Sequence, residues 1–73
     1  MTKLPQVTAR ETLRKLKRSG MVIKRKRGPH YVLYGEGRRY AVVPKHPSKV
    51  LKKGTLGKIL EGAQLTIEEF KEL

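Results

Sequence analysis

Cysteine, aspartate and long apolar segments are all absent from this sequence of 73 residues. The lack of cysteine excludes a disulfide framework and thiolate metal sites, and it fits a protein of a reducing compartment. The longest unbroken apolar run, from Tyr40 to Pro44, is far shorter than the roughly 20 residues that a membrane-spanning helix needs. The N-terminal residues also lack the apolar stretch of a secretory signal peptide. We therefore expect a cytoplasmic protein without a role at the membrane.

The scarcity of acidic groups narrows the chemistry that the chain can perform. Its six carboxylate side chains all belong to glutamate, and four of them lie in residues 61–73. Metal sites need several converging oxygen or imidazole ligands, and only two histidines, His30 and His46, are present. Paired carboxylate catalysis and a nucleophilic triad lack the acidic partner that each requires. We therefore expect neither a metal nor another cofactor.

Positive charge is what the sequence has in excess. Eighteen Lys and Arg side chains stand against six Glu, which gives a formal net charge of +12 at pH 7. Residues 1–60 carry seventeen cations and two anions, whereas residues 61–73 carry one cation and four anions. Such a surface predicts a polyanionic partner. Its contacts with phosphates would weaken steeply as the salt concentration rises.

Capping motifs and apolar spacing predict the helices. The first helix is expected to begin at Thr8, whose hydroxyl can pair with the Glu11 amide while the Glu11 carboxylate pairs with the Thr8 amide, and to end near Gly20. A second helix, with Thr55 as its N-cap, is predicted from four apolar residues at helical spacing: Leu56, Ile59, Leu60 and Ala63. Another capping box, from Thr66 to Glu69, predicts a short C-terminal helix.

The middle of the chain is typical of three antiparallel strands. Met21 to Arg27 begins apolar and ends wholly cationic, as suits an edge strand whose charges discourage pairing with another sheet. The runs Tyr31–Tyr34 and Tyr40–Val43 are β-branched or aromatic, and residues 35–39 between them contain two glycines, which predicts a hairpin. Both runs are apolar on both faces, so the pattern does not decide which face meets the helices. Their tyrosines are interpreted as core and hairpin residues in preference to platforms for stacking bases.

The predicted order is therefore one helix, three strands, a second helix and a short helical tail, in a single domain spanning residues 1–73. In α+β domains of this size, the helices cover one face of an antiparallel sheet. We expect a fold like that of double-stranded-RNA-binding domains (dsRBD-like), with the two main helices on one face of a three-stranded sheet.

The stretch from Lys24 to Tyr34 holds the clearest indication of chemistry. Four consecutive cations, Lys24 to Arg27, are followed by a Gly28-Pro29 turn that places His30 at the start of an apolar strand. Histidine exchanges protons near neutral pH. It can remove the proton of an RNA 2′-hydroxyl group or protonate the departing 5′ oxygen, while Lys and Arg stabilise the charge of the transition state. On the residues alone, a purely structural histidine at a strand end is the favoured interpretation.

Five motifs follow one another between Arg27 and Phe70. They are Arg27-Gly28-Pro29-His30, Val42-Val43-Pro44-Lys45-His46, Lys52-Lys53-Gly54-Thr55-Leu56, Ile59-Leu60 and Leu65-Thr66-Ile67-Glu68-Glu69-Phe70. In their order and spacing they resemble the HicA toxin family of messenger-RNA interferases, and the resemblance runs from about Val7 to the C-terminus. The resemblance implies a catalytic role for His30, a second catalytic or substrate-positioning role for His46, and an acidic HicB-type antitoxin as partner. Pro29 and Gln64 depart from it, because the family usually has serine and glycine at these positions.

The leading hypothesis is an mRNA interferase, a metal-independent endoribonuclease that cleaves RNA by attack of the 2′-hydroxyl group and does not act on DNA directly. The RNA-binding residues are expected to be nine cations: Lys24, Arg25, Lys26, Arg27, Arg38, Arg39, Lys45, Lys52 and Lys53. Two alternatives are a non-catalytic double-stranded-RNA-binding module, in which His30 is structural, and a small basic protein associated with ribosomes or the nucleoid.

Overall fold

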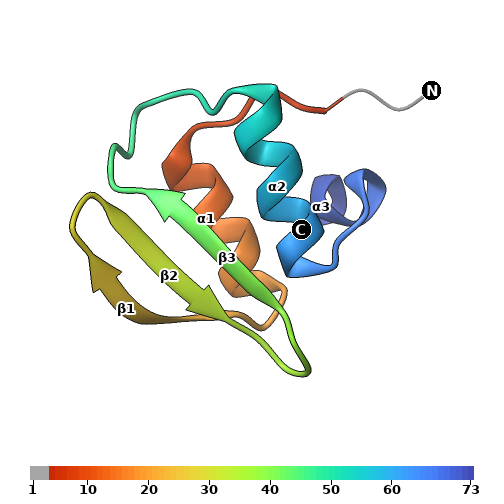
Figure 1. The fold of residues 1–73 in the computed structure, drawn as a ribbon. Coiled ribbons are helices and arrows are strands. Elements are labelled where there is room, and N and C mark those ends of the chain that lie inside the picture. Colours follow the sequence, from red (N-terminus) through yellow and green to blue (C-terminus); the bar gives the residue numbers. More distant parts are fainter. Residues whose placement is uncertain (1–3) are drawn as a thin grey trace.

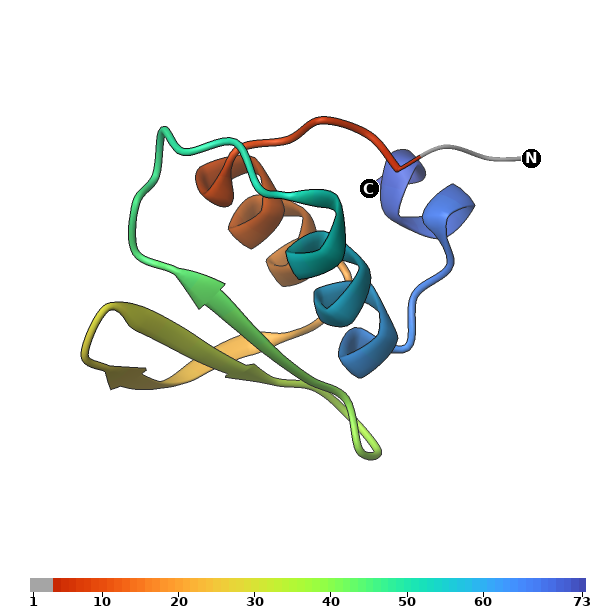
Figure 2. The same ribbon diagram turned by 45° about the horizontal axis from the view of Figure 1, so that its top comes forward.

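Three strands and three helices make up residues 4–73, the part of the chain that the computed structural model describes. Their order is α1 (Ala9–Arg18), β1 (Val22–Arg27), β2 (His30–Tyr34), β3 (Tyr40–Pro44), α2 (Lys53–Ala63) and α3 (Ile67–Glu72). The strands form an antiparallel sheet in the order β1-β2-β3, and α1 and α2 lie over one of its faces (Figure 1 and Figure 2). This arrangement confirms the predicted dsRBD-like α+β fold. None of the helices in these described residues has the length and apolar character of a membrane span.

The two predicted capping boxes begin α1 and α3. The Glu11 amide donates to the Thr8 hydroxyl (3.2 Å), and the Thr8 amide donates to the Glu11 carboxylate (3.1 Å). The bonds from Thr8 lower the pKa of the Glu11 carboxyl, because they favour its charged form. Thr66 and Glu69 make the corresponding pair of bonds at α3.

The start of α2 differs from the prediction. The helix begins at Lys53, and its N-cap is Lys52, whose side chain makes no capping hydrogen bond. Thr55 lies inside the first turn, so the prediction of Thr55 as the N-cap is wrong. Apolar spacing could not locate this turn, because no residue of the helix before Leu56 is buried. At the other end, Gln64 adopts the left-handed conformation (φ 57°) that favours glycine, and it closes the helix there.

The faces of β2 and β3 are distinguished by which side chains join the hydrophobic core, because Val32 is buried on the other face without belonging to that core. Leu33, Ala41 and Val43 are buried toward the helices, and Tyr31 is half-buried beside them. They belong to one hydrophobic core whose helical members include Leu16, Leu56, Ile59 and Phe70. Since side chains alternate along a strand, the residues between them lie on the opposite face.

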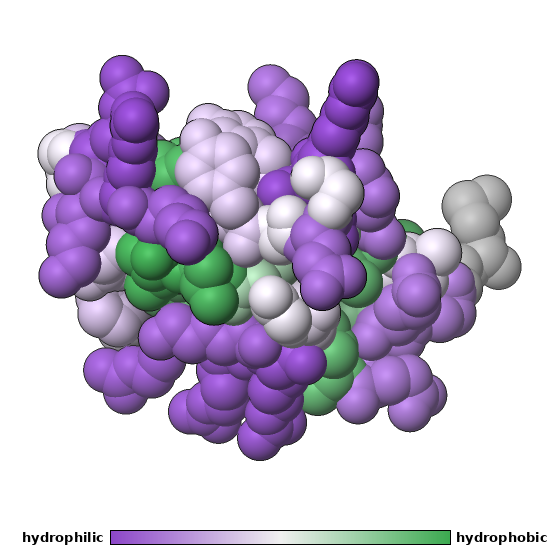
Figure 3. All heavy atoms as spheres, turned by 90° about the horizontal axis from the view of Figure 1, so that it is seen from below, coloured by the Kyte–Doolittle hydropathy of each residue, from purple (hydrophilic) through white to green (hydrophobic). Residues whose placement is uncertain are grey.

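That opposite face is left uncovered by α1, α2 and α3 (Figure 2). Tyr34 and Tyr40 pair across β2 and β3 on this face, with their ring centroids 5.3 Å apart in an edge-to-face arrangement, and each is 41% exposed. They are hairpin residues, as interpreted from the sequence, but they lie at the surface. Figure 3 views the molecule from below and shows apolar and weakly polar side chains grouped among hydrophilic ones.

β1 is an edge strand that is interrupted at Lys24. The register of its pairing with β2 shifts between Ile23 and Arg25, so Lys24 is the extra residue of a β-bulge. A bulge and a run of charges both discourage an edge strand from pairing with another sheet, as predicted for this segment. The strand begins at Val22, one residue later than expected, and Met21 instead lies in the core (1% exposed).

Lys15, a cation on α1, holds α3 in place. The Lys15 ammonium group donates to the carbonyl oxygens of Phe70 (3.2 Å), Lys71 (3.4 Å) and Leu73 (3.2 Å), and it lies 5.2 Å from the centroid of the Phe70 ring. The last carbonyls of a helix have no partner within the helix, and the helix dipole favours a cation beside them. Lys15 thus joins α1 to the C-terminal helix.

Candidate active site and nucleic-acid interface

His30 is the first residue of β2 and lies at one end of the sheet. It pairs with Arg27 of β1 on one side and with Pro44 of β3 on the other. Its side chain is exposed on the uncovered face, opposite to that of Tyr31. Within residues 4–73, the side-chain hydrogen bonds do not involve its imidazole. Both ring nitrogens are therefore available to a substrate.

The loop between β1 and β2 contains only Gly28 and Pro29, and its geometry accommodates the proline. Gly28 has φ +53°, and a positive φ at this first position is required by both common two-residue hairpin turns. Proline cannot adopt the second positive φ of a type I′ turn, whereas its φ of about −65° suits the second position of a type II′ turn. Pro29 still contributes to the sheet, because its carbonyl oxygen accepts a hydrogen bond from the Lys45 amide (2.8 Å).

His46 lies at the same end of the sheet as His30. The bond between Lys45 and Pro29 continues the pairing of β2 and β3 by one residue, and His46 follows directly after it. The carbonyl oxygen of His46 accepts from the Lys49 amide (3.0 Å), which turns the chain back, and both histidines are exposed. Among the described residues, no group of three or more His, Asp or Glu side chains is placed to hold a metal ion.

The cations of β1 are divided between the two faces of the sheet. Arg27 pairs with His30 and shares the uncovered face with it, as does Arg25 two residues earlier. Lys24 projects from the bulge, and Lys26 lies on the opposite face. All four side chains are exposed. Two guanidinium groups therefore share a surface with the imidazole.

Three further lysines, Lys45, Lys52 and Lys53, lie beyond β3. The Lys45 ammonium group is 5.2 Å from the centroid of the Tyr31 ring, and that of Lys26 is 6.0 Å from the same centroid. Lys52 and Lys53 are exposed at the start of α2, where no side chain caps the first amides of the helix. The helix dipole favours an anion at such an end, and these lysines add positive charge to it.

The remaining two predicted RNA-binding residues, Arg38 and Arg39, lie at the opposite end of the sheet from His30. They belong to the hairpin loop beyond the last pair of β2 and β3. The Arg39 guanidinium donates to the Ala63 carbonyl (2.7 Å), the Ser19 carbonyl (2.9 Å) and the Ser19 hydroxyl (2.7 Å). It joins the ends of α1 and α2 to the hairpin, and each of its three nitrogens donates to an acceptor of the fold. Arg38 is exposed.

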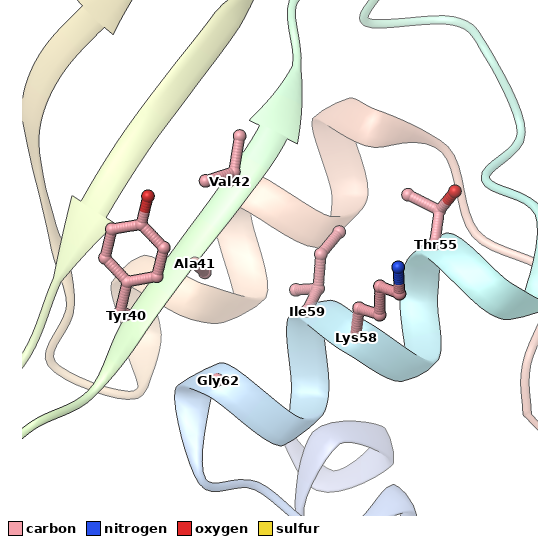
Figure 4. A pocket seen from close by; sticks show the side chains of 7 residues that line it. All are labelled: Tyr40, Ala41, Val42, Thr55, Lys58, Ile59 and Gly62. Atoms are coloured by element: carbon pink, nitrogen blue, oxygen red, sulfur yellow. The ribbon is translucent and has the colours of Figure 1, made fainter.

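A cavity between β3 and α2 has no counterpart in the sequence predictions. Its volume is about 290 Å³, and it is lined by Tyr40, Ala41, Val42, Thr55, Lys58, Ile59 and Gly62 (Figure 4). Gly62 permits the close approach of α2, because a Cβ atom at this position would overlap with the Tyr40 carbonyl oxygen. A glycine inside a predicted helix is the one sign of this approach in the sequence.

Residues 9–65 match a family model described as the HicA toxin of bacterial toxin-antitoxin systems. The matched segment contains α1, the whole sheet, α2 and both histidines, and α3 lies beyond it. A search among curated proteins found no match.

Proposed function

Because this chain belongs to the HicA toxin family of bacterial toxin-antitoxin systems, we propose that it is an mRNA interferase that cleaves RNA without a metal ion. The observation that carries this proposal is the exposed His30 imidazole beside Arg27 on the uncovered face of the sheet. A proton-transfer group and a cation are the two elements that cleavage by a neighbouring hydroxyl group requires. The net charge of +12 supports a nucleic-acid substrate.

In the proposed reaction, the RNA supplies its own nucleophile. His30 takes the proton of a 2′-hydroxyl group while the 2′ oxygen attacks the adjacent phosphorus. The bond from phosphorus to the 5′ oxygen then breaks, and the 5′ oxygen takes a proton from a general acid or from water. The products are a 2′,3′-cyclic phosphate and a 5′-hydroxyl group. Arg27 and Arg25 are proposed to stabilise the negative charge that develops on the phosphoryl oxygens.

His46 is proposed as the second proton-transfer group or as a residue that positions the RNA. It follows the residue bonded to Pro29, so its backbone lies beside the turn that precedes His30. If one histidine acts as the base and the other as the acid, the rate rises and then falls as the pH increases. His46→Ala would then remove one limb of that profile, whereas a positioning residue would change the affinity and leave both limbs.

The proposed RNA-binding surface surrounds the His30 end of the sheet. It consists of seven cations, namely Lys24, Arg25, Lys26, Arg27, Lys45, Lys52 and Lys53. Arg38 is retained as a peripheral contact because it is exposed, and Arg39 is left out because each of its three side-chain nitrogens donates to an acceptor of the fold. Phosphate contacts by these cations would make the affinity for RNA fall as the salt concentration rises.

Membership of the family implies a HicB antitoxin as partner. We propose that the antitoxin presents an acidic surface to this chain and covers His30 or the approach to it. Opposite charges on the two surfaces would accelerate association and disfavour other partners. The complex is then expected to form more slowly at high salt and to cleave no RNA.

The test uses the purified chain in EDTA with an RNA oligonucleotide whose cleavage site has been mapped. The matched substrate carries a single 2′-deoxy nucleotide on the 5′ side of the cleaved bond. The wild-type chain should cut only the first substrate and leave a 2′,3′-cyclic phosphate. His30→Ala should cut neither, and Lys71→Ala, a change in the acidic tail, should cut like the wild type. Equal cleavage of both substrates would refute the mechanism.

RNA binding without cleavage is the other informative outcome. If the wild-type chain binds RNA but never cuts it, and His30→Ala binds with the same affinity, the chain acts as a dsRBD-like binding module. Binding to ribosomes or DNA in preference to RNA and antitoxin would instead favour a ribosome- or nucleoid-associated protein.

A further inference from the structure

We propose that the cavity between β3 and α2 binds one nucleobase of the RNA and gives the cleavage a sequence preference. This inference rests on the proposed function, because it assigns the cavity to the same substrate. The cavity borders the uncovered face through Tyr40 and Val42, which lie on the same side of the sheet as His30.

The free edge of β3 supplies the hydrogen-bonding groups. In the hairpin of β2 and β3, the Lys45 amide donates to the Pro29 carbonyl and the Gly35 amide donates to the Arg39 carbonyl. The odd-numbered residues of β3 therefore direct their backbone groups toward β2. Successive residues of a strand direct their backbone groups to opposite edges. The N–H and C=O of Val42 therefore face away from β2, toward the cavity that this residue lines. One donor and one acceptor side by side match the edge of a nucleobase, which carries both kinds of group.

The walls of the cavity suit a flat and partly apolar ligand. Figure 4 shows β3 and α2 close together at Gly62 and farther apart at Thr55, so the cavity narrows toward the hairpin. Ile59 and Val42 supply apolar surface, whereas the Tyr40 ring lies on the other side of β3 from Ile59, where it pairs with Tyr34 of β2. Apolar walls accept any base, whereas hydrogen bonds to the base edge distinguish one base from another.

A β-strand from a protein partner fits this edge poorly. Strand addition needs several unpaired backbone groups in a row along the edge. The carbonyl of Tyr40 is closed off by Gly62, and Pro44 has no amide proton, so Val42 is the one residue of β3 that presents both groups to the edge. The charge of the chain favours a nucleic acid over a neutral peptide as the occupant.

The cavity is also close enough to His30 for one RNA strand to reach both. Val42 precedes Pro44, the partner of His30, by two residues, which corresponds to about 7 Å along a strand. A phosphodiester held at His30 would thus leave a base of a neighbouring nucleotide near Val42. Lys58, exposed at the rim of the cavity, would attract the intervening backbone phosphate.

A binding measurement can test the cavity without any cleavage. The probes are the four nucleoside 5′-monophosphates and ribose 5-phosphate, titrated into the His30→Ala chain while the amide resonances of Val42 and Ile59 are followed by NMR. We expect one nucleotide to shift both resonances and to bind at least about fivefold more tightly than the weakest-binding of the four nucleotides. This factor is the lower end of the discrimination that paired hydrogen bonds to a base give. Ribose 5-phosphate, which has no base, should shift both resonances less than the preferred nucleotide does.

Three results would overturn the assignment. These are equal shifts with all four bases, the same shifts with ribose 5-phosphate, or no shift with any nucleotide. The titration measures binding to the His30→Ala chain and does not depend on cleavage. An absence of ribonuclease activity in the wild type would therefore refute the proposed function but not the binding of a base in the cavity.

Filling the cavity tests its effect on cleavage. Val42→Phe places a larger side chain on one wall of the cavity, and Thr55→Leu places a larger apolar side chain at its wider end. Val22→Phe is the matched control, because Val22 is exposed on the uncovered face but lies on β1, two strands away. Sequencing of cleaved RNA ends should show a preferred base at one fixed position for the wild type and Val22→Phe. Either cavity variant, if folded by circular dichroism, should reduce that preference at least fivefold, and an unchanged preference in both would refute the proposal.

Discussion

At the His30 end of the sheet the cations of β1 project into solvent, whereas at the other end the Arg39 guanidinium is enclosed by the ends of α1 and α2. Both ends carry several basic residues, and composition does not separate them. The difference lies in the acceptors nearby: Arg39 meets carbonyl and hydroxyl oxygens of its own chain, while Arg27 lies beside an imidazole. A cation without protein acceptors is available to phosphate, and a cation with them stabilises the fold.

The largest effect is expected from His30→Ala, which should remove activity and preserve stability. Loss of a positioned proton-transfer group typically lowers a rate by about 10²- to 10⁴-fold. The free energy of unfolding should change by less than about 0.5 kcal/mol, because the side chain is exposed. Single-turnover cleavage and urea denaturation measure the two quantities on the same preparation.

The control for this variant is His46→Ala, at the same end of the sheet. If His46 only positions the RNA, the rate of cleavage at saturating enzyme should fall much less in His46→Ala than in His30→Ala. A large loss of stability in His30→Ala would contradict the comparison between the two ends, because it would show that His30 also holds the fold.

Arg39→Ala should show the opposite behaviour, with a loss of stability. The change removes three hydrogen bonds from a charged group and leaves the Ala63 carbonyl without this donor, which should lower the free energy of unfolding by about 2–3 kcal/mol. Arg38→Ala is the matched control, since Arg38 is the neighbouring residue and is exposed. It should change the stability by less than about 0.5 kcal/mol.

Urea denaturation of the two variants side by side decides this point. If Arg39→Ala is as stable as Arg38→Ala, and its affinity for RNA falls more, then Arg39 belongs to the RNA-binding surface after all. In that case, the boundary that we draw between the two ends of the sheet is wrong.

Local motifs made the fold predictable from the sequence. Both capping boxes are contained within four residues, and the hairpin follows from two apolar runs and the glycines between them, so none of these features depends on distant contacts. The start of α2 was not predicted correctly, because this helix has no side-chain cap and no buried residue before Leu56. The sequence contains no local mark of such a turn.

The candidate site was predictable only in part. His30 and the cations before it are adjacent in the chain, so their grouping is visible in the sequence. The acceptors of Arg39 lie 20 and 24 residues away, and the cavity joins two elements through the contact between Gly62 and Tyr40. Contacts of this kind exist only once the chain has folded, and no spacing rule applies to them.

A smaller effect is expected from Lys24→Ala, which tests whether the exposed cations act independently. Loss of one phosphate contact should reduce the slope of log affinity against log salt by about 0.7 for a single-stranded RNA. At a salt concentration of about 0.1 M, this slope corresponds to a loss of affinity of roughly fivefold. Filter binding or fluorescence anisotropy over a range of salt concentrations measures both.

Lys71→Ala is the control for this variant, since Lys71 is the one cation of residues 61–73 and lies on α3. It should leave the slope unchanged. An equal change in slope for the two variants would show that the RNA responds to the net charge of the chain and does not contact Lys24.

The smallest effect is expected from Pro29→Ser, which introduces the residue that the family usually has before the histidine. Serine can adopt the second position of a type II′ turn, and its carbonyl can still accept from the Lys45 amide, so His30 should keep its place. The free energy of unfolding should fall by about 0.4–1 kcal/mol, because serine leaves the unfolded chain more flexible than proline does. Cleavage should change by less than about fivefold, the equivalent of one hydrogen bond. A gain of activity well beyond this would mean that the serine hydroxyl or amide binds the phosphate, and that the turn in this chain lacks one of the groups of the site.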